Sequence, residues 1–318
     1  MKYLITGISG FVGGHYLEYL SRQNFDLQII SGDLQRPKFD FLGESFQKKI
    51  KFYKGSLLDK KYILNLIKKY KPDYIVNLAS YSSVAYSWIN PVECFVNNTN
   101  AFLNLAEAVR TTGVKTRILS IGSSEEYGVV DTKDIPLTER SPLNPISPYA
   151  VARVAQERLS KVYAAGYKIP IICTRSFNHV GPRQRENFAV SSFAKQIIEA
   201  KKNKNGEIIS GNLDIIRDFV DVRDVVRAYD CILHKGKVGE VYNVCSGQGY
   251  KLSEIIKMLQ EKAKTNFPVK VDPNLLRPVD NPVIIGSCEK LEKDIEFKNK
   301  YSLSQSLTDV LEYWQNRL

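Results

Sequence analysis

The chain has 318 residues, of which 43% are hydrophobic and 25% charged, and this composition is typical of a globular protein rather than a disordered or fibrous one. No apolar run approaches the ~18–20 residues that a bilayer-spanning helix needs, and the N-terminus MKYLITGISG lacks the apolar core of a secretory signal. We therefore expect a cytoplasmic protein without a membrane partner. The net charge is +11, but the lysines lie mostly on predicted helix faces such as KYILNLIKKYK, which favours a solvated surface and no nucleic-acid partner.

Five cysteines and three histidines are scattered along the chain, and no two cysteines form a CxxC pair. This spacing argues against a disulfide framework and against a zinc site. We therefore expect reduced, mostly buried thiols and no bound metal.

Short apolar runs alternate with helix-like periodicity through the first half of the chain. The runs predict strands over residues 2–6, 27–31, 50–53, 73–79, 116–122 and 169–176, and the segments between them predict helices over 11–22, 60–70 and 92–111. This alternation with short connections predicts an α/β fold, a Rossmann-type doubly wound parallel sheet with helices on both faces.

Beyond residue 175 strand-like and helix-like segments alternate less regularly, and two further helices are predicted over 252–264 and 303–317. We assign residues 1–175 to a dinucleotide-binding domain and residues 176–318 to a smaller α/β lobe that binds the substrate, with some of its segments returning to the first domain. Because no flexible linker separates the two halves, we expect the site in the crevice between them.

A glycine loop follows the first predicted strand and opens the first predicted helix. Its glycines are Gly7, Gly10 and Gly13, in a GxxGxxG spacing. The first permits a tight turn, the second lets the backbone approach a pyrophosphate, and the third lets helix and strand pack closely, while the unpaired N–H groups around Phe11 and Val12 face the phosphates. Strand, glycine loop and helix in this order predict a nicotinamide-dinucleotide site.

The second predicted strand ends at Asp33, about 20 residues beyond the glycine loop, where a carboxylate accepts hydrogen bonds from the ribose hydroxyls of NAD and repels the 2′-phosphate of NADP. Arg36 nearby could instead pair with a 2′-phosphate. The expected cofactor is NAD, with NADP left open.

A serine and a tyrosine suggest chemistry on an alcohol or a ketone. Ser123 follows the predicted strand TRILSIG, and Tyr149 and Arg153 are one helical turn apart behind the N-terminal pair Ser147-Pro148. A fixed cation next to a tyrosine stabilises its phenolate, and a serine hydroxyl can hold the substrate oxygen against it. The set predicts a proton-transfer site for hydride exchange at a carbinol carbon.

The motifs TGISGFVG, VNLAS, SSEEYG, SPYAVAR, RDFVDVRDV and YNVCSG occur in the order and at the spacing of the extended short-chain dehydrogenase/reductases, which the chain resembles over nearly its full length. Within that superfamily FNHVGPRQ, SSFAKQI and RPVDNPVIIGS are most similar to the GDP-4-keto-6-deoxy-mannose reductases and next to the GDP-mannose 4,6-dehydratases. The resemblance implies a bound NAD(H) or NADP(H), a nucleotide-diphospho-sugar substrate, and chemistry at the sugar C4.

By matching position, the resemblance implies that Ser123 orients the C4 oxygen and that Tyr149 is the acid–base. It implies that Asn98 is a buried support of the catalytic helix. It also implies two sets of binding residues: for the cofactor Leu57, Leu78, Ala79 and the residues of the glycine loop, and for the substrate Ser80, Asn178, Lys195, Arg217 and Arg277.

The chain departs from the family at two positions. Arg153 stands where the family has a lysine that binds the nicotinamide ribose; arginine keeps the positive charge but cannot relay a proton, so we expect altered activity rather than none. Ser56 stands where an aspartate near the adenine is usual, which leaves adenine recognition to the backbone around Leu57 or to water.

Three functions remain open. A 4-ketoreductase is favoured, because the second half of the chain matches the reductases in several separate stretches. A 4,6-dehydratase is the alternative, since Ser124 and Glu125 occupy the positions of the additional acid and base. The third is a dinucleotide-binding regulator that has lost catalysis, in which case Arg153 in place of the family lysine would be the sign of that loss. The resemblance also implies a homodimer that pairs through the predicted helices over 92–111 and 147–165.

Overall fold

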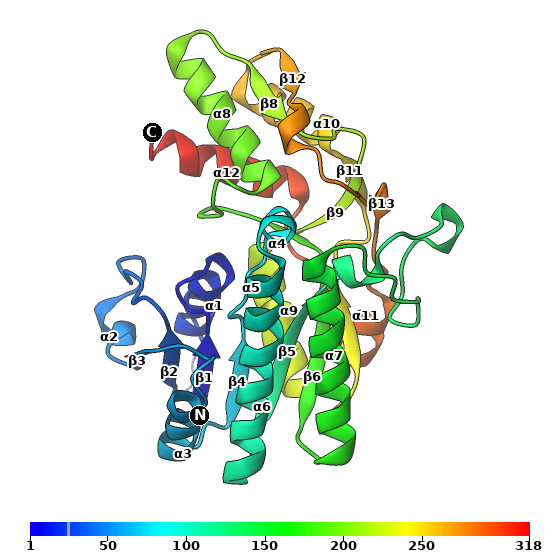
Figure 1. The fold of residues 1–318 in the computed structure, drawn as a ribbon. Helices are drawn as coiled ribbons and strands as arrows, with labels where there is room; N and C mark the ends of the chain where they lie inside the picture. The colour runs from blue at the N-terminus through cyan, green and yellow to red at the C-terminus, as the bar shows by residue number, and fades with distance from the viewer. Residues whose placement is uncertain (24–25) are drawn as a thin grey trace.

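The computed structural model describes residues 1–23 and 26–318 and has a parallel sheet at its centre. The order along this sheet is β10-β6-β5-β4-β1-β2-β3, and every neighbouring pair is parallel (Figure 1). Its strands are β1 (Lys2–Thr6), β2 (Gln28–Asp33), β3 (Ile50–Lys54), β4 (Tyr74–Asn77), β5 (Arg117–Ser123), β6 (Ile171–Ser176) and β10 (Val241–Val244). The chain reverses its direction of travel along the sheet between β1 and β4, so the predicted doubly wound α/β fold is confirmed.

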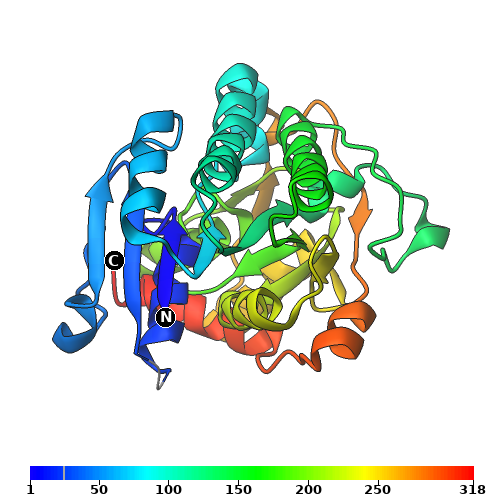
Figure 2. The same ribbon diagram turned by 90° about the horizontal axis from the view of Figure 1, so that it is seen from below.

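Helices cover both faces of this sheet, as the view from below shows (Figure 2). One face carries α1 (Phe11–Ser21), α9 (Val222–Lys235) and α11 (Glu289–Ile295); the other carries α3 (Lys60–Tyr70), α6 (Ala101–Thr112) and α7 (Pro148–Gly166). Helix α3 illustrates the local cause: the Asp59 side chain accepts hydrogen bonds from the first-turn N–H groups, and Ile63, Leu66 and Ile67 face the core at helical spacing.

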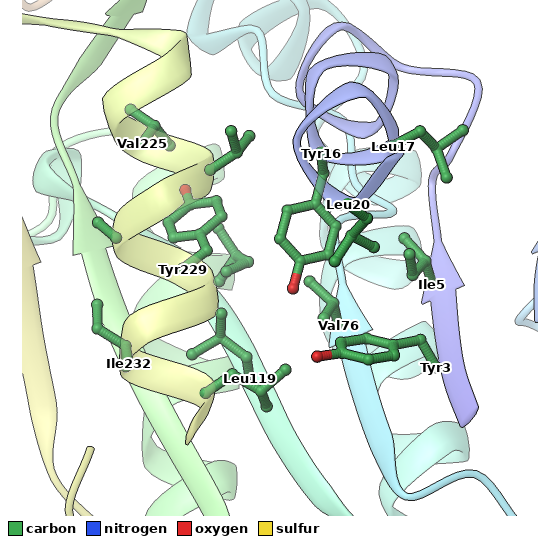
Figure 3. Packing of buried hydrophobic residues seen from close by; sticks show 14 of the residues in the cluster. Tyr3, Ile5, Tyr16, Leu17, Leu20, Val76, Leu119, Val225, Tyr229 and Ile232 are labelled. Carbon is green, nitrogen blue, oxygen red and sulfur yellow. The ribbon is translucent and has the colours of Figure 1, made fainter. Parts of the chain in front are cut away.

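The contact between α1 and α9 is a tightly packed part of the core (Figure 3). Tyr16 of α1 and Tyr229 of α9 are completely buried over the central strands, together with Tyr3 of β1. Asp230 is buried among them and accepts hydrogen bonds from Tyr16 at 2.9 Å and Tyr19 at 3.3 Å. A segment from the second half of the chain is thus built into the core of the first half.

The predicted helix over 92–111 is interrupted in the structure. Helices α4 (Val84–Ile89) and α5 (Pro91–Phe95) lead into a π-helical turn, Val96–Asn100, before α6 begins. Such turns insert an extra residue into a helix and redirect its side chains, and here the turn directs Asn98 toward the loop after β4.

The smaller lobe is built around strand β9 (Ile216–Asp221), with β11 (Gly249–Lys251), β13 (Val283–Ile284) and β7 (Asn178–Val180) beside it. Three helices pack against one another over this sheet: α8 (Ala189–Asn203), α10 (Leu252–Ala263) and α12 (Leu303–Gln315). A parallel pair, β8 (Ile208–Ser210) and β12 (Val269–Val271), lies at the edge of the lobe, and the short α2 (Glu44–Gln47) follows β2. No helix in the described parts of the chain is long and apolar enough to cross a membrane.

Candidate active site

The glycine loop passes close to the loop after β4. At Gly7, with φ +68°, an added Cβ would lie 2.6 Å from the backbone nitrogen of Ala79 and 2.7 Å from the carbonyl carbon of Leu78; at Gly13 it would lie 2.6 Å from the carbonyl oxygen of Gly7. Helix α1 starts without a side-chain cap and without an acidic residue in its first turn. Its first N–H groups and its positive dipole end are therefore left for an anionic ligand, and the residues present fit the pyrophosphate of a dinucleotide.

Asp33 lies at the end of β2, next to the glycine loop. Its carboxylate accepts hydrogen bonds from the Ser9 amide at 3.0 Å and the Ser9 hydroxyl at 2.6 Å, and from the Leu34 amide at 2.7 Å. The side chain is only partly buried and Arg36 is exposed. The loop thus fixes a carboxylate where the sequence analysis expects the adenosine ribose.

Tyr149 and Arg153 lie one above the other on α7. Ser147 caps this helix by accepting the Ala150 N–H at 3.1 Å, so Tyr149 occupies the first turn, where it is 5% exposed. The guanidinium carbon of Arg153 is 5.2 Å from the centre of the Tyr149 ring. This distance allows a cation–π contact and a direct electrostatic influence on the phenol.

The Arg153 guanidinium is buried and joins three elements. One terminal nitrogen donates to the Ile121 carbonyl of β5 at 3.0 Å and to the side chain of Gln156 at 2.7 Å, and the other donates to the Ser80 hydroxyl in the loop after β4. Its Nε is buried and has no hydrogen-bond partner among the described residues. Arg153 therefore holds Ser80, a predicted substrate residue, and keeps one donor for a further acceptor.

Ser123 is the last residue of β5, and α7 packs against both this strand and the turn that follows it. The Ser123 hydroxyl accepts the Glu125 N–H at 3.2 Å, and its own N–H donates to Glu126 at 2.7 Å. Ser124 is buried, whereas Glu125 is half-buried and its carboxylate makes no hydrogen bond or ion pair within residues 1–23 and 26–318. Ser123 is thus fixed beside the helix of Tyr149, and the Glu125 carboxylate remains available.

Arg217 and Arg277 of the smaller lobe share one carboxylate. Arg217 donates to Asp280 at 3.0 Å and to the Asn281 carbonyl at 2.7 Å, and Arg277 lies 3.6 Å from the same Asp280 oxygen. Arg217 is 4% exposed, and desolvation lowers its pKa although Glu125 and Asp280 act in the opposite direction. The two arginines form a cationic cluster on the side of the site where Glu125 lies.

The other two predicted substrate residues have different surroundings. Asn178 donates to the Asp218 carbonyl of β9 at 3.4 Å, and Asp218 directly follows Arg217 of the cationic cluster. Lys195 lies on α8, where it forms ion pairs with Glu186 and with Glu199, the latter at 3.6 Å. The side-chain contacts of Lys195 are therefore with residues of its own lobe, and Arg217 and Arg277 are not among them.

Two supporting residues have other partners than expected. The Leu57 carbonyl accepts a hydrogen bond from Asn104 of α6 at 3.0 Å, so this atom is occupied within the protein. Asn98 binds both backbone groups of Tyr81, at 2.8 and 2.9 Å, and thereby supports the loop after β4 rather than the catalytic helix. Thr99, the next residue, reaches that helix at the Ala152 carbonyl.

Four further residues, not predicted as site residues from the sequence, shape this site: Ser9, Glu126, Gln156 and Asp280. Gln156 joins Arg153 to Ser120 of β5, and it lies three residues after that arginine, as Asp280 lies three residues after Arg277. For Gln156, which lies on α7, this i, i+3 spacing is the signal that could have found it, whereas Asp280 lies outside any helix. In the described parts of the chain no group of three or more His, Cys, Asp or Glu side chains could hold a metal ion.

Comparison with known proteins gives consistent matches. The model of the GDP-mannose 4,6 dehydratase family matches residues 4–310. A GDP-6-deoxy-D-mannose reductase of Pseudomonas aeruginosa is 30% identical over 100% of this chain and 98% of its own.

Solved structures match over the whole chain as well. The structure of RMD from Pseudomonas aeruginosa complexed with NADPH has a TM-score of 0.87 at 30% identity, covering 100% of this chain and 99% of that one. A UDP-glucose 4-epimerase of Thermotoga maritima, solved with UDP-glucose, has a TM-score of 0.89 at 27% identity and the same coverage. One architecture therefore serves reductases and epimerases of nucleotide sugars.

Proposed function

Because this chain belongs to the GDP-mannose 4,6-dehydratase family, we propose that it is an NAD(P)-dependent enzyme acting at C4 of a GDP-linked sugar, as a reductase of a GDP-4-keto-6-deoxy sugar. The observation that carries the proposal is the placement of Tyr149 and Arg153 on the helix that packs against the strand and turn of Ser123. The full-length similarity to a GDP-6-deoxy-D-mannose reductase supports the reductase over the dehydratase.

The reaction follows from these groups. A nicotinamide dinucleotide held by the glycine loop and Asp33 would supply or accept the hydride. In ketone reduction the Tyr149 hydroxyl gives its proton to the C4 oxygen as the hydride reaches C4, so that a carbinol and a phenolate result. Ser123 donates a hydrogen bond to the same oxygen, and the positive charge of Arg153 stabilises the phenolate. The phenolate then takes a proton from solvent, which restores the enzyme.

We propose NAD(H) as the cofactor, because a carboxylate held at the position of Asp33 accepts ribose hydroxyls and repels a 2′-phosphate. NADPH, which is present in the structure of the Pseudomonas relative, is the alternative. Titration with NADH and NADPH, followed by the change in nicotinamide fluorescence, decides between them.

A dehydratase is the second candidate, and the free Glu125 carboxylate favours it. Removal of water across C5 and C6 needs a base at C5 and an acid at the C6 hydroxyl, for which Glu125 and Ser124 are the candidates. Such an enzyme returns its hydride within one catalytic cycle and consumes no added cofactor.

The deciding experiment supplies two substrates. With a GDP-4-keto-6-deoxy sugar and NADH or NADPH, a reductase oxidises the cofactor in proportion to the ketone consumed. With GDP-mannose and no added cofactor, a dehydratase releases the 4-keto-6-deoxy sugar. Binding of cofactor with neither reaction would leave the regulator as the remaining function and would refute the proposal.

We also propose a homodimer formed through the outer faces of the helices over 92–111, which are α5 and α6 in the structure, and of α7. Helices α5 and α6 both pack against α7, and the exposed side chains of these helices include Val92 at 74% and Val162 at 58% exposure. Exposed apolar side chains gathered on neighbouring helices are typical of an oligomer interface. Light scattering on the wild type and on Val92→Lys should give a dimer and a monomer, respectively.

A cytoplasmic location completes the proposal. It rests on the cysteines, all five of which are free thiols: Cys94, Cys173, Cys231, Cys245 and Cys288. Fractionation of the source cells with an antibody against the protein tests it.

A further inference from the structure

The turn that follows β5 is closed by a glutamate. The Glu126 side chain accepts the N–H of Ser123 at 2.7 Å, while the Ser123 hydroxyl accepts the N–H of Glu125, so the two side chains form a capping box around a single 3₁₀ turn, Ser124–Tyr127. The backbone position of Ser123, and with it the direction of its hydroxyl, is therefore set by Glu126.

Glu126 is completely buried, and its second carboxyl oxygen has no hydrogen-bond partner among the described residues. Gly122 makes room for it: a Cβ there would lie 2.4 Å from the Glu126 carboxyl and 2.4 Å from the Thr174 carbonyl. A buried carboxylate with one neutral hydrogen bond and no cation in contact is unfavourable, so the neutral acid is favoured. Burial, followed by the charge of Glu157, raises the pKa of Glu126 to about 8.

Charged and titratable groups face Glu126 from three elements. Glu157 raises its pKa, while Arg175 and Arg153 lower it. Glu157 is itself bound by Arg175 through two hydrogen bonds, at 2.8 and 2.9 Å, and by Lys161 at 2.9 Å. The groups that face Glu126 include Arg153 and Glu157 on α7 and Cys173 and Arg175 on β6, and Tyr127 follows it in its own turn.

Arg175 is held by Glu157 and by the Glu139 carbonyl at 3.2 Å, whereas Arg153 lies 5.2 Å from the Tyr149 ring. Arg153 is therefore the cation through which the charge of Glu126 bears on the active site. We infer that Glu126 is a positioning residue of the proposed active site: its carboxyl holds Ser123 in place and, by gaining or losing one proton, sets how much of the Arg153 charge acts on Tyr149. This inference rests on the proposed function of Ser123 and Tyr149, and it adds a residue that touches neither substrate nor cofactor.

The effect on catalysis has a definite direction. While Glu126 is neutral, Arg153 is uncompensated and favours the Tyr149 phenolate. When Glu126 ionises in alkaline solution, its negative charge offsets that of Arg153, and less net positive charge then acts on the Tyr149 phenol. Ketone reduction needs the protonated phenol, so the wild-type reduction rate should persist further into the alkaline range than that of a protein with a neutral residue at this position.

Two variants separate the two roles. Glu126→Gln keeps an acceptor for the Ser123 N–H but cannot ionise, whereas Glu126→Leu removes both properties. Asp230→Asn is the matched control, because Asp230 is also a buried carboxyl with a raised pKa but lies in the tyrosine cluster between α1 and α9.

For Glu126→Gln we expect kcat near pH 7 within roughly 3-fold of the wild type, and an alkaline limb of the reduction displaced to lower pH by on the order of 0.5–1 unit. For Glu126→Leu we expect kcat to fall roughly 10-fold or more with KM little changed, since Ser123 loses its restraint. Asp230→Asn should keep the wild-type pH profile. Coincident pH profiles for wild type and Glu126→Gln would overturn the inference.

A measurement without substrate distinguishes failure of the inference from failure of the proposed function. Infrared spectra of the wild type should contain a protonated-carboxyl band that disappears between about pH 7 and 9 and is missing from Glu126→Gln. If the wild type has no such infrared titration, the inference fails whatever the enzyme catalyses, and this result does not depend on the folding of any variant.

Discussion

Replacement of Arg153 by lysine tests how this protein uses its unusual cation. The guanidinium makes three hydrogen bonds with two nitrogens, to Ile121, Gln156 and Ser80, and is 4% exposed. The lysine ammonium is a compact charge on a shorter side chain, and it keeps at most two of these three hydrogen bonds. Each lost hydrogen bond to a charged group costs about 1.5–3 kcal/mol, so Arg153→Lys should lower the free energy of unfolding by about 2–4 kcal/mol in total.

Calorimetry and activity measurements should then give different results for the two substitutions. Arg153→Lys should unfold roughly 4–8 °C below the wild type but keep turnover within about 10-fold, because the charge beside Tyr149 remains. Arg153→Ala should lose turnover by roughly 100-fold or more. Arg158→Lys, an exposed change on the same helix, is the control and should leave both quantities unchanged. An Arg153→Ala protein with normal turnover would refute the assignment of Arg153 as the cation that acts on Tyr149.

Three further changes test the cofactor site and its surroundings. Gly7→Ala should abolish dinucleotide binding in calorimetric titration, while Gly113→Ala, which has a similar positive φ but nothing within 4 Å of the new Cβ, should lose only about 1 kcal/mol of stability and bind normally. Asp33→Ala should shift the ratio of NADPH to NADH affinity toward NADPH by roughly 10-fold, and an unchanged ratio would remove Asp33 from cofactor selection. Burial, followed by the charge of Arg183, lowers the pKa of His15 to about 4, so this group costs up to about 3 kcal/mol of stability as the pH falls from 6.5 to 4. His15→Gln should therefore be less sensitive to acid in denaturant titrations at these two pH values.

The large sheet could be predicted from the sequence because its signals are local. The predicted strands are short apolar runs, and five of the six are mainly buried, the exception being the edge strand β3. Helices α3 and α7 start at recognisable caps, Asp59 and Ser147. Helix α9 was missed although it carries a strong apolar face, because its first residues belong to the motif RDFVDVRDV and were interpreted as a signature rather than as a helix. The strand β10 was also missed, since only pairing with β6 identifies it as part of the large sheet.

The candidate site was predictable where one residue type determines the chemistry. Gly7, Tyr149 and Ser123 follow from spacing and neighbouring elements, and the structure brings their elements together. The partners of Arg153 and Arg217 were not predictable, because Ser80 and Asp280 are distant in the sequence from the groups they bind. The π-helical turn that redirects Asn98 has no signal in a single sequence.

The place of β10 in the sheet has a consequence for how the chain folds during synthesis. Until residues 241–244 have left the ribosome, β6 has an open edge, and α1 has no α9 to cover Tyr3 and Tyr16. Pairing between segments so far apart in the sequence is slow and leaves apolar surface exposed meanwhile. We therefore expect the nascent first half to expose apolar surface of the kind that chaperones bind, and the large sheet to be completed only when the later segments have docked.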